Sequence, residues 1–163
     1  INVGIRPLFP LNEIVSGKQV PDSFTEFKCV KRFCDLGTLV IAHCNDMYSY
    51  EQEVCSKTQL NSLELRCNLT GSLAEAFAAQ LHGIAAMLEE MDLIERSMTE
   101  TKLIASEPTT AEQDAQTEYI NCVKDIVVSN HVWSLLGGRY YSPTSPFQEL
   151  RIPPHDFARS VFA

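Results

Sequence analysis

Residues 72–105, the stretch that decides the fold, read SLAEAFAAQLHGIAAMLEEMDLIERSMTETKLIA. Apolar side chains recur there on a seven-residue repeat, which places them on one side of a helix. The opening Ser72-Leu73-Ala74-Glu75 fits a helix-capping box, and Pro108 ends the pattern because proline disfavours helical geometry in the residue before it. The stretch predicts one amphipathic helix about 50 Å long. Its stripe consists of Ala74, Leu81 and Leu88 at one position of the repeat and Phe77, Ile84, Met91 and Met98 at the other.

Two further helices are predicted, over residues 24–54 and 110–136. In the first, the repeat passes through Gly37, which favours one helix with a close contact at that glycine over two helices with a bend. The second follows the 72–105 helix after a very short connection, so the two are expected to form an antiparallel hairpin. Residues 56–71 are expected to cross over with a single helical turn.

The two ends of the chain are rich in helix-breaking residues. Prolines and glycines in residues 1–21 exclude a helix of any length there, and the segment is expected to be an extended arm that packs on the helices. Residues 139–163 form an extended tail rich in proline and aromatic residues, with two helical turns possible after Pro154. The sequence therefore predicts an all-α fold, an elongated three-to-four-helix bundle that forms a single domain over residues 1–163.

The composition restricts the class of partner. The chain has 163 residues, 45% of them hydrophobic, and a formal net charge of -8. A negative protein does not attract nucleic acid phosphates or anionic lipid, and no apolar run approaches the length of a membrane span. The chain opens at Ile1, which suits a mature product whose signal peptide has been removed. A protein partner is therefore expected, in an oligomeric state that the sequence leaves open.

The cysteine count points to an oxidising compartment. None of the six forms a C-x2-C pair, so we predict three disulfides in a secreted protein. Cys34 and Cys122 lie at similar distances from the expected hairpin tip and are predicted to pair. A glycosylation sequon begins at Asn68. The predicted disulfide cysteines are Cys29, Cys34, Cys44, Cys55, Cys67 and Cys122.

No set of residues indicates a reaction. The four histidines are scattered, and the chain has no HExxH, glycine-elbow serine or phosphate loop. We therefore predict no catalytic residue, no metal, no cofactor and no enzymatic activity.

Two surfaces are candidates for binding. Acidic residues concentrate between Glu89 and Glu118, and the basic cluster of Lys28, Lys31 and Arg32 is expected to neutralise them in part; a docking patch for a basic receptor is the alternative. Trp133 falls on the apolar stripe and is expected in the core. Aromatic and arginine side chains dominate interface energies. The candidate partner-binding residues are therefore Arg139, Tyr140, Tyr141 and Phe147.

Together these features predict a secreted, disulfide-braced helical protein that acts by protein–protein binding. In outline, residues 24–136 resemble the helical cytokine class, although the chain shows three long helices and none of that class's motifs. A secreted effector or the ectodomain of a surface receptor fits the same pattern. The alternative is a carrier that holds a small apolar ligand between its helices, lined by the adaptable side chains of Phe77, Met87, Met91 and Met98.

Overall fold

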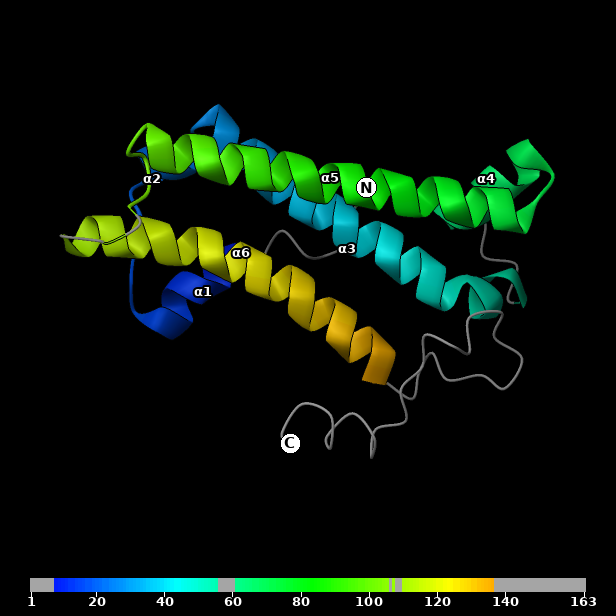
Figure 1. Ribbon diagram of the computed structural model, residues 1–163. Helices are drawn as coiled ribbons and strands as arrows, with labels where there is room; N and C mark the ends of the chain where they lie inside the picture. The colour runs from blue at the N-terminus through cyan, green and yellow to red at the C-terminus, as the bar shows by residue number, and fades with distance from the viewer. Residues whose placement is uncertain (1–7, 56–60, 106, 108–109, 137–163) are drawn as a thin grey trace, which may run out of the picture. The chain divides into compact units, whose positions relative to one another are not determined.

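The computed structural model describes residues 8–55, 61–105, 107 and 110–136, which form six helices and no strand (Figure 1). The predicted all-α class is confirmed. None of the described helices combines the length and the apolar character that a membrane span needs. The helices are α1 (Leu8–Ser16), α2 (Asp22–Thr25), α3 (Lys28–Cys55), α4 (Ser62–Thr70), α5 (Leu73–Glu100) and α6 (Ala111–Leu136).

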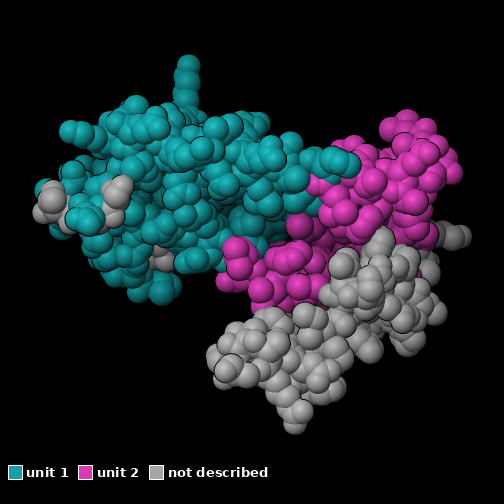
Figure 2. Space-filling model, viewed as in Figure 1, with its two compact units in different colours: residues 1–42, 82–127 teal, residues 43–81, 128–163 magenta. Residues whose placement is uncertain are grey.

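The chain divides into two compact units (Figure 2). Unit 1 comprises residues 1–42 and 82–127, and unit 2 comprises residues 43–81 and 128–163. Helices α3, α5 and α6 each run from one unit into the other, whereas α1 and α2 belong to unit 1 and α4 to unit 2.

Unit 1 has an apolar core. Aromatic and aliphatic side chains from all five of its helical segments are almost fully buried there. Phe24 and Tyr119 meet edge to face with ring centroids 6.0 Å apart, a geometry that aromatic pairs favour. The core consists of Phe9, Val20, Phe24, Val30, Phe33, Leu36, Met91, Met98, Ile104, Ala115, Tyr119, Ile120 and Val123.

Within unit 1, α5 runs antiparallel to both α3 and α6. Arg32 donates two hydrogen bonds to the Glu90 carboxylate, at 2.7 and 2.8 Å, so a predicted basic side chain does neutralise an acid of α5. Lys124 lies 2.7 Å from Glu95. Thr117 exchanges hydrogen bonds with the backbone of residue 105, just after α5. The predicted hairpin is therefore confirmed in this unit.

The predicted stripe of α5 is only half correct. Ile84, Met91 and Met98 are buried, but Leu81 and Leu88 are 45% and 41% exposed. The buried row runs instead through residues 76, 80, 84, 91 and 98, and Met87 on the same side is partly buried.

Three predicted helix boundaries are wrong for local reasons. Residues 8–16 form α1 because Pro10 lies in the first turn, where its missing N–H has no intrahelical acceptor to lose. The first long helix is interrupted after Thr25, where a tight turn with a bond from the Phe27 N–H to the Phe24 carbonyl precedes α3. Helix α5 ends at Glu100, before the expected position, because Lys102 adopts a left-handed φ of 57°.

Gly37 lies in the middle of α3, which is one continuous helix as predicted. A Cβ atom at this position would lie 3.2 Å from Val123 Cγ1 and 3.3 Å from Val127 Cγ2 of α6. The predicted close contact at this glycine is therefore confirmed. Gly83 of α5, in contrast, would meet nothing within 4 Å.

We expect Gly37→Leu to lower the free energy of unfolding by about 1–3 kcal/mol, because a full side chain has no room against α6. Gly83→Leu, the same change in open space, is expected to raise it by a few tenths to about 1 kcal/mol through helix propensity. Urea unfolding followed by circular dichroism measures both. Equal effects of the two substitutions would contradict the close approach at residue 37.

Candidate functional site

Unit 2 differs from unit 1 in what it buries. Of the five buried polar residues among those described, four belong to unit 2: Ser49, Asn61, Gln80 and Ser134. Burial of a polar group is unfavourable unless it is hydrogen-bonded. A buried polar cluster is therefore the feature around which a site in this unit has to be built.

One face of α3 in unit 2 carries three oxygen-bearing side chains. Asn45, Ser49 and Glu53 are spaced four residues apart, so they lie within about 80° of one another around the helix axis. Ser49 is 2% exposed and donates to the Asn45 carbonyl at 2.8 Å, which leaves the lone pairs of its hydroxyl available. The amide, hydroxyl and carboxylate oxygens of these residues form what we call the α3 oxygen face.

The start of α4 is tied to this part of α3. Asn61 donates to the Asp46 carbonyl at 2.7 Å and to Glu53 Oε2 at 3.0 Å. The Ser62 N–H donates to Asp46 Oδ2 at 2.9 Å. Asp46 thus holds the start of α4 against α3. It is next to Asn45 in the sequence but does not belong to the α3 oxygen face.

A second set of hydrogen bonds joins α5 to α3 and α4. Gln80 donates to the His43 carbonyl at 3.0 Å and to Ser62 Oγ at 3.1 Å. His43 Nδ1 lies 3.2 Å from the same hydroxyl. Burial lowers the pKa of His43, and nearby Arg66 acts in the same direction, whereas Asp46 opposes it. The imidazole is therefore held in its neutral form.

Tyr48 and His131 bring α6 against α3. The tyrosine hydroxyl lies 3.2 Å from His131 Nδ1, and the ring centroids are 5.6 Å apart. Burial lowers the pKa of His131 and raises that of Tyr48, where Cys44 adds to the shift. Both groups are therefore neutral at physiological pH.

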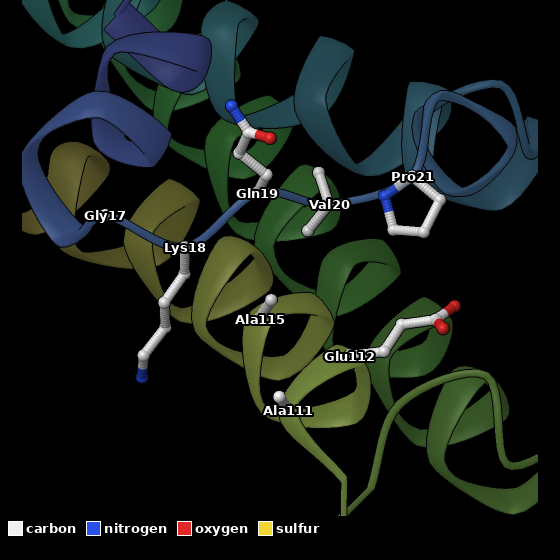
Figure 3. A pocket seen from close by; sticks show the side chains of 8 residues that line it. All are labelled: Gly17, Lys18, Gln19, Val20, Pro21, Ala111, Glu112 and Ala115. Carbon is white, nitrogen blue, oxygen red and sulfur yellow. The ribbon is translucent and has the colours of Figure 1, made fainter.

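The hollow drawn in Figure 3 belongs to unit 1 and encloses about 520 Å³. Residues 17–21 and the start of α6 line it, and Figure 3 shows Lys18 and Glu112 directed away from each other. Lys18 is paired with Asp114 at 2.8 Å and with Glu118, which raise its pKa. The lining brings no catalytic pair together, so we do not place the site here.

The α3 oxygen face suits a hard divalent cation. Magnesium takes oxygen ligands, needs only one or two protein carboxylates and completes its shell with water and substrate phosphate. Among the described residues no group of three His, Cys, Asp or Glu side chains is arranged to hold a metal. The donors present here are one carboxylate, one amide and one hydroxyl, which fit magnesium and do not fit zinc.

The fold and this face define a class: an all-helical protein with a candidate site for a hard cation. Residues 1–90, more than half of the chain, match the family model described as terpene synthase family 2, C-terminal metal binding. The chain belongs to this terpene synthase family. The α3 oxygen face lies within the matched residues.

Three curated relatives agree. Terpene synthase 4 of Physarum polycephalum is 29% identical over 128 residues, 78% of this chain and 35% of that protein. Terpene synthase 1 of Physarum polycephalum is 25% identical over 129 residues, 79% of this chain and 36% of that protein. Terpene synthase 6 of Dictyostelium discoideum is 26% identical over 158 residues, 94% of this chain and 42% of that protein. The chain thus spans 35–42% of the length of these relatives. No solved structure matches it.

These matches overturn the predicted function. The chain belongs to a family of enzymes, so the predictions of a cytokine-like ligand, an effector, a receptor ectodomain or an apolar-ligand carrier, and of no enzymatic activity, are wrong. The predicted secretion is wrong too, because the family match and the relatives point to a terpene synthase and not to a secreted ligand. A helical pattern and six cysteines are therefore compatible with an enzyme family and do not by themselves indicate a secreted bundle.

The predicted disulfides are not supported. Cys34 Sγ lies 3.9 Å from the Tyr119 hydroxyl and is not bonded to Cys122. The side chain of Cys55 lies outside the described residues. The described cysteines form no disulfide and are all half-buried: Cys29, Cys34, Cys44, Cys67 and Cys122.

The other predicted site residues do not come together. Asn68 is exposed on α4, but the argument for a glycan there depended on secretion and fails with it. Trp133, predicted in the core, is 53% exposed. The candidate partner-binding residues lie outside the described residues, so partner binding stays a prediction: Arg139, Tyr140, Tyr141 and Phe147.

Sequence reasoning missed the α3 oxygen face. The signal was present, because Asn45, Ser49 and Glu53 recur every four residues on a predicted helix. Two of these three residues are neutral, so they do not form the cluster of histidine, cysteine or acidic side chains that is typical of a metal site.

We expect Gln80→Met to lower the free energy of unfolding by about 1–3 kcal/mol, because it leaves buried partners on α3 and α4 unsatisfied while nearly keeping the volume. The control is Gln116→Met on α6, where the amide bonds to Glu112 in an exposed position; its effect should stay within about 0.5 kcal/mol. Urea unfolding measures both. A neutral Gln80→Met would show that the network contributes little.

We also expect unfolding to become easier as the pH falls below about 6.5, the ordinary pKa of histidine. The pKa values of His43 and His131 are lower in the folded state, so the unfolded chain binds more protons in this window and stability is lost as the pH falls. The double variant His43→Gln, His131→Gln should flatten the dependence between pH 7.5 and about 5.5. An unchanged dependence of the free energy of unfolding on pH in the double variant would contradict the lowered pKa values of the two histidines.

Proposed function

We propose that this chain is the metal-binding part of a terpene synthase that acts on an isoprenoid diphosphate. The observation that carries the proposal is the α3 oxygen face, with Asn45, Ser49 and Glu53 on one side of a helix inside the segment matched by a metal-binding family model. The names of the relatives support the activity, which belongs to proteins longer than this chain.

The three residues have distinct tasks. Glu53 supplies the one negative charge of the face, whereas Asn45 and Ser49 supply neutral oxygens. A single carboxylate compensates half of the positive charge of a divalent cation, and the remaining positive charge attracts a diphosphate. If Asn45, Ser49 and Glu53 held a magnesium ion, the ion would supply positive charge opposite the leaving diphosphate. The composition of the face therefore favours a phosphate-bearing substrate.

The surrounding residues keep the face in place. Asp46 and Asn61 fix α4 beside α3, and Gln80 joins both helices to α5. Ser49 is almost fully buried, so little water competes for its hydroxyl. These residues hold ligands and exclude solvent; they take no part in bond breaking.

We expect Glu53→Gln and Ser49→Ala each to weaken binding of Mn²⁺, a spectroscopic substitute for Mg²⁺, by about tenfold or more. Titration followed by electron paramagnetic resonance measures the free ion, and gas chromatography measures terpenes formed from C10 and C15 isoprenoid diphosphates. The matched control is Glu75→Gln, which removes the same charge from an exposed position on α5 of unit 2.

Binding that responds equally to Glu53→Gln and Glu75→Gln would show a nonspecific effect of charge and exclude the α3 oxygen face. Wild-type binding that neither Glu53→Gln nor Ser49→Ala weakens would place the ion elsewhere.

A further inference from the structure

Asn61 is the most fully used polar side chain described in unit 2. It is 0% exposed. Its Nδ2 donates to the Asp46 carbonyl and to Glu53 Oε2, at 2.7 and 3.0 Å. Its Oδ1 accepts from the N–H groups of Leu63 and Glu64, at 2.9 and 3.2 Å. One buried amide therefore joins the carboxylate of the α3 oxygen face to the first turn of α4.

The Asn61 side chain has two structural roles that different substitutions can separate. As the N-cap of α4, Asn61 provides an acceptor, which serine, threonine or aspartate also provides. As a donor to Glu53, Asn61 provides a side-chain N–H group, which serine, threonine and aspartate lack. The choice of asparagine is explained by the donor, since the cap alone would be satisfied by several residue types.

The contact with Glu53 has a direct geometric effect. A carboxylate has two oxygens, and the bond from Asn61 Nδ2 to Oε2 restricts how the plane of the Glu53 carboxylate can turn. Asn61 is itself anchored at the Asp46 carbonyl and at two backbone N–H groups, so it does not move with Glu53.

We propose that Asn61 is a positioning residue that orients Glu53 toward the cation. The inference rests on the proposed function, since it assumes that Glu53 is a ligand. Replacing a residue that hydrogen-bonds to a metal ligand, without touching the metal itself, typically lowers metal affinity by about 10–100-fold.

The test uses Asn61→Ser, which keeps a capping acceptor and removes the donor to Glu53. We expect a loss of Mn²⁺ affinity of about tenfold or more, measured by electron paramagnetic resonance. Asn61→Thr, a second capping residue without the donor, should give the same loss and replaces the first variant if that does not fold. Both variants should keep the helical circular dichroism spectrum.

The control separates positioning from capping. Ser72→Ala removes the cap of α5, where the serine Oγ accepts from the Glu75 N–H at 3.3 Å. It should lower the melting temperature without changing Mn²⁺ affinity, because Ser72 does not touch the α3 oxygen face. Loss of affinity in Asn61→Ser at a melting temperature no lower than that of Ser72→Ala supports the proposal.

Two results would overturn it, and they are distinct. If the wild-type chain binds Mn²⁺, Glu53→Gln weakens binding and Asn61→Ser does not, the positioning role is wrong and the proposed function stands. If the wild-type chain does not bind Mn²⁺, the proposed function fails and takes this inference with it.

Discussion

The interior of unit 2 is shaped by one constraint: a buried amide or hydroxyl without a hydrogen-bond partner costs about 1–3 kcal/mol. The Ser134 hydroxyl lacks such a partner, but the buried side chains between α3, α4 and α5 have theirs. Asn61 donates to the Asp46 carbonyl, and the Ser62 N–H donates to the Asp46 carboxylate. Gln80 donates to the His43 carbonyl and to the Ser62 hydroxyl, so these bonds join α3, α4 and α5. Directional bonds of this kind fix distance and orientation together, whereas apolar contacts tolerate sliding. A cation site needs such orientation, since its ligands have to converge on a single point.

Unit 1 is held together in another way. Its core is aliphatic and aromatic, and the side-chain bonds of α5 to α3 and α6 include ion pairs near the surface, such as Arg32 with Glu90. Exposed ion pairs contribute little to stability, so packing carries this unit, including the close approach at Gly37. Helices α3, α5 and α6 each contribute residues to both units: in unit 1 they pack through apolar side chains, and in unit 2 they are joined by hydrogen bonds between side chains.

The long helices were predictable because periodicity extends over many turns, and α6 begins and ends within one residue of its predicted bounds. Helix α1 was not, since a proline count does not show that Pro10 occupies a first turn. Helix α4 was underestimated although its cap is local, because Asn61 Oδ1 accepts from the N–H groups of Leu63 and Glu64. The bond from Asn61 to the Asp46 carbonyl, which ties this start to α3, could not be read from the sequence. The α3 oxygen face required knowing which polar residues of a half-polar helix are buried, and a single sequence does not show burial.

The thiols have a consequence for what a cysteine means in this chain. Burial raises the pKa of Cys44 to about 11, so its sulfur keeps its proton at neutral pH. A protonated, half-buried thiol is a poor nucleophile and behaves as a small apolar side chain. At such a position the size of the side chain matters more than its chemistry. An alanine or a valine at the same position in a related protein would change the packing volume but would remove no redox function.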